Sequence, residues 1–196
     1  MKLLLTTPLV LLALLAPLHA SADVEKGSDA YLAGNYATAV QEFKKAAEQG
    51  NAEAQFNLGV MYSNGRGVLQ DDKEAVRLYR LAAEQGIAQA QYNLGIMYNN
   101  GEVVLQDYKE AVKWYRLAAE QGKANAQFNL GNMYANGRGV IQDNVYAHMW
   151  WNIAASEGSE TAKENRDIIA KQMTPSQIAE AQKLARECVA KDYKGC

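Results

Sequence analysis

A repeat of 36 residues runs through most of this 196-residue sequence. The stretch 53–86 recurs twice more, and Gly50, Gly86, Gly122 and Gly158 mark its period. A repeat of this length is one supersecondary unit that cannot bury its own apolar face, so neighbouring copies must stack. The sequence therefore predicts an all-α solenoid of helical hairpins, an architecture that usually provides a binding surface.

Each copy predicts a first helix (helix A), a loop and a second helix (helix B). In the first full copy, Ala54, Leu58 and Tyr62 recur at i, i+4 and i+8, which is the period of one helix face. Gly65 ends this helix, because glycine adopts the positive φ of a helix C-terminus. One such hairpin uses all 36 residues of a copy, and the hairpins stack in the order of the chain.

Helix B begins with a capping carboxylate in every copy. Asp71 and Asp107 stand where a side chain accepts from the first free amides, and Glu74 and Glu110 follow at the capping-box position. Asp143 keeps the cap without the glutamate. Carboxylate pairs such as 71–72 are therefore interpreted as helix caps, with an acid/base couple as the alternative.

A stripe of alanines and large apolar side chains, most of them aromatic, follows helix B at the spacing i, i+3, i+4, i+7. Its members are Ala75, Leu78, Tyr79, Ala82, Ala111, Trp114, Tyr115, Ala118, Ala147, Trp150, Trp151 and Ala154. Small alanines let helix axes approach, and aromatic rings fill the space between hairpins. We expect this stripe to form the core, with a cofactor site as the alternative.

Glycine recurs at two further places. In mid-helix A, Gly59, Gly95 and Gly131 coincide. Such a glycine costs about 1 kcal/mol relative to alanine, so its recurrence predicts a close contact in which a side chain would clash. In the loops, Gly-Arg-Gly occupies 65–67 and 137–139, whereas the middle loop has Gly101-Glu102-Val103. Either this position needs no positive φ, or the middle loop has a different shape.

The first 22 residues are expected to be a signal peptide. Lys2 is basic, 9–15 is a short apolar run, and Ala20-Ser21-Ala22 is an A-x-A cleavage site, with cleavage after Ala20 as the alternative. The run is short for a membrane span. We therefore predict Sec-type export to the periplasm or the outside of the cell, without stable membrane insertion after cleavage, and the alternative is an uncleaved membrane anchor.

Export bears on the only two cysteines, Cys188 and Cys196, which lie in the last nine residues. In an oxidising compartment an even number of cysteines at short spacing indicates a disulfide. This bond would close a small loop and contribute roughly 2–3 kcal/mol. The alternative, a redox or metal pair, lacks C-x-x-C spacing and a nearby histidine.

The flanks extend the repeat in a degenerate form. Residues 23–50 keep the pattern of small and aromatic residues with a short connector, and the run 174–177 (TPSQ) has the cap, proline and box residue of a last helix. We expect about ten helices in five hairpins, divided into a signal peptide (1–22), an N-terminal hairpin (23–50), three repeats (51–86, 87–122 and 123–158) and C-terminal capping helices with the cysteine-closed tail (159–196).

The repeat resembles a known family. Its pattern A-x-A-x-x-x-L-G-x-x-Y-x-x-G, then G-V-x-x-D, A-x-x-W and A-A-x-x-G, is similar to the Sel-one-like repeat, a relative of the tetratricopeptide repeat. The matching residues of the first copy are Ala52, Ala54, Leu58, Gly59, Tyr62, Gly65, Gly67, Val68, Asp71, Ala75, Ala82, Ala83 and Gly86. Leu78 replaces the usual tryptophan, which Trp114 and Trp150 retain.

The resemblance implies a right-handed superhelix that scaffolds protein complexes, and for exported bacterial members a link with envelope assembly or host interaction. It also implies an alternative function, because some cysteine-rich relatives are described as β-lactamase-like or cell-wall-linked. Those relatives carry a cysteine pair in each repeat, whereas the repeats of this chain contain none. We therefore expect a non-enzymatic protein- or peptide-binding scaffold.

Catalytic, cofactor and nucleic-acid motifs are not found. The net charge of -2 provides no basic patch for nucleic acid. After the signal peptide the chain has one histidine, His148, which we expect at the surface or its boundary. No S-x-x-K, P-loop, G-x-G-x-x-G or H-E-x-x-H motif occurs. We predict no cofactor and no metal.

Asparagines on helix A are the candidate binding residues. In a tetratricopeptide-like stack, helix A lines the concave face, and an amide matches a peptide backbone because it both donates and accepts. The candidates are Asn57, Asn93, Asn129 and Asn132, with the neighbouring rings of Phe56, Tyr92 and Phe128. The alternative is structural, through bonds to a neighbouring hairpin. Asn64, Asn100 and Asn136 precede glycine and are expected to complete the end of helix A.

Overall fold

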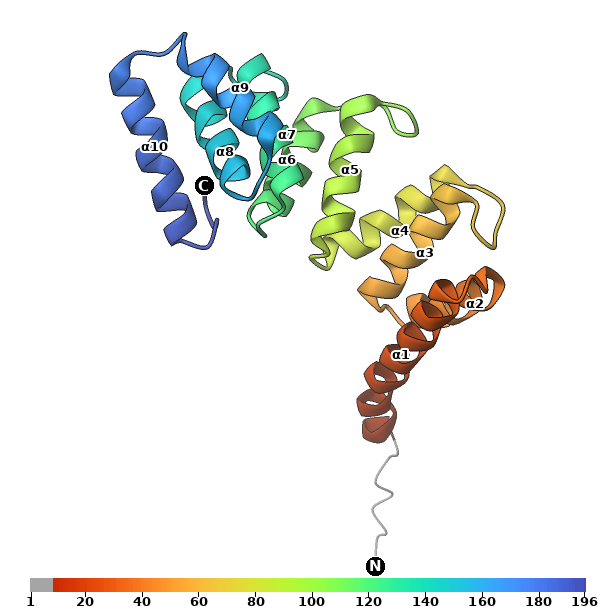
Figure 1. Ribbon diagram of the computed structural model, residues 1–196. Helices are drawn as coiled ribbons and strands as arrows, with labels where there is room; N and C mark the ends of the chain where they lie inside the picture. Colours follow the sequence, from red (N-terminus) through yellow and green to blue (C-terminus); the bar gives the residue numbers. More distant parts are fainter. Residues whose placement is uncertain (1–8) are drawn as a thin grey trace, which may run out of the picture. The chain divides into compact units, whose positions relative to one another are not determined.

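The computed structural model describes residues 9–196, with side chains described from Ser21 onward (Figure 1). Within that range the chain forms ten helices and no strand, which confirms the predicted all-α helical-repeat fold. Contacts divide the chain into two compact units, Met1–Gln85 (unit 1) and Gly86–Cys196 (unit 2).

Unit 1 contains four helices: α1 (Leu9–Leu32), α2 (Tyr36–Glu48), α3 (Ala52–Asn64) and α4 (Asp72–Glu84). Helices α1 and α2 form one hairpin, α3 and α4 form a second, and α2 packs on α3. Their core includes Val24 and Phe43. The expected signal peptide falls partly on residues 1–8, outside the described range, and partly on α1. No described helix combines the length and the apolar character needed to span a bilayer.

Unit 2 contains six helices: α5 (Ala88–Asn100), α6 (Tyr108–Ala119), α7 (Ala124–Asn136), α8 (Asn144–Ser156), α9 (Glu160–Ala170) and α10 (Pro175–Ala190). Helices α5 and α6 form a hairpin, α7 and α8 form another, and α6 packs on α7. The last two helices differ from the expected fifth hairpin, because both pack mainly on α8. Helix α9 is polar and buries only Ala162, so it offers α10 little apolar surface.

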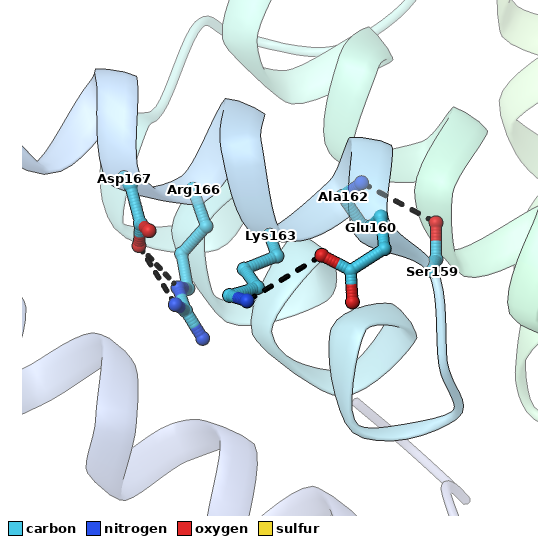
Figure 2. Close-up of polar contacts among 6 residues, drawn as sticks. All are labelled: Ser159, Glu160, Ala162, Lys163, Arg166 and Asp167. Carbon is cyan, nitrogen blue, oxygen red and sulfur yellow. Dashed lines mark hydrogen bonds and ion pairs between the residues drawn. The ribbon is translucent and has the colours of Figure 1, made fainter.

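Figure 2 shows the polar contacts at the cap of α9 and between neighbouring residues along it. The Ser159 hydroxyl accepts from the Ala162 amide at 3.3 Å and caps the helix. Lys163 lies 3.4 Å from Glu160, and Arg166 lies 2.7 Å from Asp167. Exposed pairs of this kind contribute little stability, so α9 depends on its contact with α8.

The helix caps follow the sequence prediction, with one correction. Asp71 accepts from the Glu74 amide at 3.0 Å, so the cap is present. The Glu74 carboxylate, however, binds Arg77 at 2.6 Å, so the expected capping box is not completed there. Glu110 likewise pairs with a lysine one turn later. A salt bridge at i, i+3 competes for the same carboxylate. Only the box at Thr174 and Gln177 forms as predicted.

The aromatic stripe of helix B is core, as expected, and each repeat uses a glycine to admit one ring. A Cβ added at the glycine would lie within 2.9 Å of that ring in all four hairpins. The pairs are Gly27 with Phe43, Gly59 with Tyr79, Gly95 with Tyr115, and Gly131 with Trp151. The predicted close contact therefore exists, and it is with a ring of helix B. Gly27 shows that residues 23–50 are a repeat with a shortened loop.

The loops resolve the two alternatives for Val103. Gly67 and Gly139 have φ of 73° and 71°, and a side chain at Gly67 would collide with the carbonyl of Tyr36. Val103 is not among the non-glycine residues with positive φ. The middle loop therefore has a different shape, as valine requires.

The C-terminal tail folds back on unit 2. Cys188 and Cys196 are joined with their Cα atoms 5.6 Å apart, which confirms that this pair can form the predicted disulfide. Within the closed loop, the Tyr193 hydroxyl donates to Glu157 at 3.0 Å, and its ring lies over Gly122. The tail is thereby fixed to the ends of α8 and α6.

Candidate functional site

Among the pockets of the described residues, two lie at the same face of helix A, one in each unit. The pocket of unit 1 (the apolar pocket) has a volume of 460 Å³ and is lined by Ser28, Tyr31, Leu32, Phe43, Glu53, Phe56, Asn57 and Val60. The pocket of unit 2 (the asparagine pocket) has a volume of 270 Å³ and is lined by Ile96, Asn99, Asn100, Tyr115, Asn129, Asn132, Met133, Asn136 and Arg138.

The two pockets lie at equivalent places in their units. Each is formed by one helix A, the ring that the following helix B seats on glycine, and the next helix A. The equivalent residues are Phe43 and Tyr115, Asn57 and Asn129, Val60 and Asn132, Tyr31 and Asn99, and Leu32 and Asn100. The pockets therefore share geometry and differ in the chemistry of a few positions.

Two asparagines of the asparagine pocket are bound to the aromatic rings beneath them. Asn129 hydrogen-bonds the Tyr115 hydroxyl, and the indole of Trp151 donates to Asn132 Oδ1 at 3.2 Å. Burial, more than the nearby Tyr92, raises the pKa of Tyr115, so this phenol stays neutral. The Nδ2 atom of Asn132 has no acceptor among the described residues, which leaves a donor on the pocket wall.

The repeats themselves are recognised by comparison. The Sel1 repeat family model matches residues 25–51, 52–87, 88–123 and 124–159. The chain belongs to the Sel1 repeat family. Members of this family generally serve as scaffolds that bind protein partners. The first match covers the shortened hairpin, in agreement with the ring that Gly27 admits there.

Solved structures similar to this Sel1 repeat chain support the assignment. A protective antigen of uropathogenic Escherichia coli, c5321, is 36% identical over 80% of this chain, with a TM-score of 0.70. This chain covers 34% of that protein, so it spans about a third of its length. A Sel1 repeat protein of Oxalobacter formigenes is 42% identical over 65% of this chain and 96% of its own, with a TM-score of 0.61.

A more distant structure shows the fold alone. The cysteine-rich protein B of Helicobacter pylori is 22% identical over 64% of this chain and 95% of its own, with a TM-score of 0.50. The comparison with curated proteins finds no match. Neither these findings nor the described residues support the β-lactamase-like alternative.

The asparagines at the ends of the A helices have the structural role expected for Sel1 repeats. Asn64 donates to the Val60 carbonyl and Asn136 to the Asn132 carbonyl, each at 2.7 Å. Asn100 differs from Asn64 and Asn136, because its side chain donates to Glu102 at 3.4 Å in the middle loop. Asn100 and Asn136 also line the asparagine pocket, which the sequence did not indicate.

The other candidates are divided between pocket and core. Phe56 lines the apolar pocket, beside Asn57. Tyr92 packs on Tyr115 with ring centroids 6.1 Å apart, and Phe128 packs against the core around Trp151. Asn93 accepts from Gln89 at 3.2 Å and lines neither pocket. The structure thus brings Asn129 and Asn132 together, and it leaves Asn93 apart from them.

A buried glutamine recurs on helix A of each 36-residue copy and was missed in the sequence. Gln55, Gln91 and Gln127 are buried; Gln85 donates to Gln55, and Gln121 to Gln91, each at 2.8 Å. In the third copy, the position of Gln85 and Gln121 holds Glu157, whose carboxylate cannot donate to Gln127. The Gln127 Oε1 atom accordingly has no partner among the described residues. The coincidence of these glutamines at the repeat period was a visible signal.

His148 corrects the sequence prediction. Its side chain is 3% exposed in the core of unit 2, although it was expected at the surface. Its position on helix B is buried in the other copies as well, where it holds Val76 and Val112. Burial first, and Arg166 second, lower the pKa of His148 below 6.5, so it is neutral in the fold.

Proposed function

We propose that this Sel1 repeat protein is an exported scaffold that binds a segment of a partner protein at the asparagine pocket. Three observations support the proposal: the pocket is concave, its wall is rich in amides, and Asn132 Nδ2 is a free donor. An amide wall matches the alternating donors and acceptors of an extended peptide.

Convergence of amides from two A helices on one cavity is the observation that carries this proposal. Asn99 and Asn100 come from α5, whereas Asn129, Asn132 and Asn136 come from α7. Stacking alone brings the helix-end residues Asn100 and Asn136 together, whereas the positions of Asn99 and Asn132 hold Tyr31 and Val60 in unit 1 and therefore need no amide for the fold. The family role as a scaffold for protein partners is consistent with this use of the surface.

Export is supported by the character of residues 1–22 and by the cysteine pair. A bond between Cys188 and Cys196 is stable in an oxidising compartment. Among the residues whose side chains are described, the first that belongs to the core of unit 1 is Val24, which lies after the expected cleavage site. Blocked processing after Ala22→Tyr substitution, with retention of the full-length chain, is the expected result if this signal peptide is used.

Site-specific photocrosslinking tests the binding proposal. A benzophenone amino acid replaces Asn99 in the pocket or, as the matched control, Lys113, which lies on the exposed face of α6. The two residues belong to one hairpin. We expect discrete crosslinked partners from position 99 and none of them from position 113. The same adducts from both positions, or none from either, would contradict the proposal.

A further inference from the structure

We propose that the asparagine pocket selects a peptide ligand that ends in a free carboxylate. This inference deepens the proposed function, because it names what the same site distinguishes. It depends on the guanidinium of Arg138, which lines the pocket together with amides and with no acidic side chain.

Arg66 of unit 1 is the equivalent of Arg138, and its guanidinium is engaged in contacts within unit 1. Its guanidinium hydrogen-bonds the Tyr31 hydroxyl and lies 5.6 Å and 5.8 Å from the ring centroids of Tyr31 and Tyr36. Arg66 is thus exposed but held by two rings and a phenol oxygen of its own unit. The apolar pocket beside it is left without a free cation.

Arg138 keeps only part of this arrangement. It lies 5.6 Å from the ring centroid of Tyr108, which is the equivalent of Tyr36. The equivalent of Tyr31, however, is Asn99, and no hydrogen bond or ion pair joins the Arg138 guanidinium to it or to any other described residue; only the Arg138 backbone amide is bonded, to the Met133 carbonyl at 3.0 Å. The side chain is exposed at the edge of the pocket. Its donors are therefore available to a ligand.

The surrounding groups favour an anion that accepts hydrogen bonds. Asn132 Nδ2 adds a second unoccupied donor on the same wall. A guanidinium presents planar paired donors that match the two oxygens of a carboxylate, and charge-assisted hydrogen bonds are roughly twice as strong as neutral ones. The Glu102 carboxylate accepts from Asn100 and is not among the lining residues.

Two probes that differ in one group test this directly. Acetyl-trialanine with a free carboxylate and its C-terminal carboxamide are titrated into the ¹⁵N-labelled protein, with the side-chain signals of Asn132 and Arg138 observed by NMR. We expect the carboxylate to bind roughly tenfold more tightly, a charge-assisted difference. Raising the ionic strength to about 0.5 M should reduce this preference, since the site is exposed.

Matched variants identify the source of the preference. Arg138→Gln should abolish it, Arg138→Lys should retain part of it, and Arg66→Gln should leave it unchanged. If carboxylate and carboxamide bind equally, the inference is wrong while the peptide-binding proposal stands. If neither shifts the pocket signals, both are contradicted. Equal loss in Arg66→Gln and Arg138→Gln would place the preference outside this pocket and overturn the inference.

Discussion

The two pockets have the same construction and different linings. Asn57 and Asn129 occupy one shared position, and a ring seated on glycine lies beneath each pocket. In unit 1 the neighbouring positions hold Tyr31, Leu32 and Val60, whereas unit 2 has asparagine at all three. The glycine beneath the ring and the shared asparagine are constant, whereas three other positions that face the cavity vary. The constant positions thus serve the fold, and we expect the three variable positions to determine what each pocket binds.

The largest expected effect comes from removing the glycine beneath one pocket. In Gly95→Val the new side chain collides with the Tyr115 ring, and we expect a loss of about 3 kcal/mol or more. Hydrogen exchange should show loss of protection in α5 and α6. Gly27→Val is the matched change beneath the apolar pocket, where Phe43 is displaced instead. If hydrogen exchange shows equal protection in wild type and Gly95→Val, the close packing of the Tyr115 ring on Gly95 is refuted.

A smaller loss is expected at the end of unit 2. Cys196→Ser opens the loop that holds Tyr193 on Glu157, with an expected cost of about 2 kcal/mol. Hydrogen exchange should increase in α10, which packs on α8. The asparagine pocket should be unaffected, because none of its lining residues lies in the tail. Altered probe binding in this variant would show that the tail and the pocket are coupled.

One substitution should convert part of the asparagine pocket towards the apolar type. Asn99→Tyr gives Arg138 the phenol partner that Tyr31 gives Arg66. We expect affinity for the carboxylate probe to fall severalfold, as the guanidinium becomes occupied. The carboxamide probe is the control and should change less. A variant that keeps the full carboxylate preference would contradict this account of the two arginines.

The smallest effect is a pH dependence confined to unit 2. His148 is the only histidine among residues 21–196, and burial lowers its pKa in the fold. The unfolded chain takes up a proton below about pH 6.5 while the folded chain does not, so unfolding free energy should fall between about pH 7 and pH 5.5. Arg166 opposes protonation and Asp167 favours it. Urea titrations of wild type and His148→Gln measure this; identical slopes would contradict it.

Much of the fold could be predicted from the sequence, because the three copies of the repeat can be aligned with one another. The buried stripe, the mid-helix glycines and the aspartate caps all recur at one spacing. The burial of His148 was missed because a lone histidine was judged by its polarity, although the equivalent residues of the other copies are Val76 and Val112, which are also buried. Gly27 was also missed, because the shortened first loop shifts its alignment with Gly95.

The site was only partly predictable. Asn129 and Asn132 were candidates from their places on helix A, but Asn93 was grouped with them because spacing alone cannot distinguish a lining residue from one held by Gln89. The availability of Arg138 depends on which side chain occupies the position of Tyr31. Such a contact between loop and helix becomes visible only when the hairpin is folded.

The most direct test of the central claim transfers the chemistry of one pocket to the other. Tyr31→Asn, Leu32→Asn and Val60→Asn are introduced together in an Arg138→Gln background, so that only unit 1 can respond. NMR titration with the carboxylate and carboxamide forms of acetyl-trialanine then reports on Arg66 and Asn57. We expect a carboxylate preference that the background protein lacks. A folded variant that binds both probes alike would contradict the claim that these positions determine recognition.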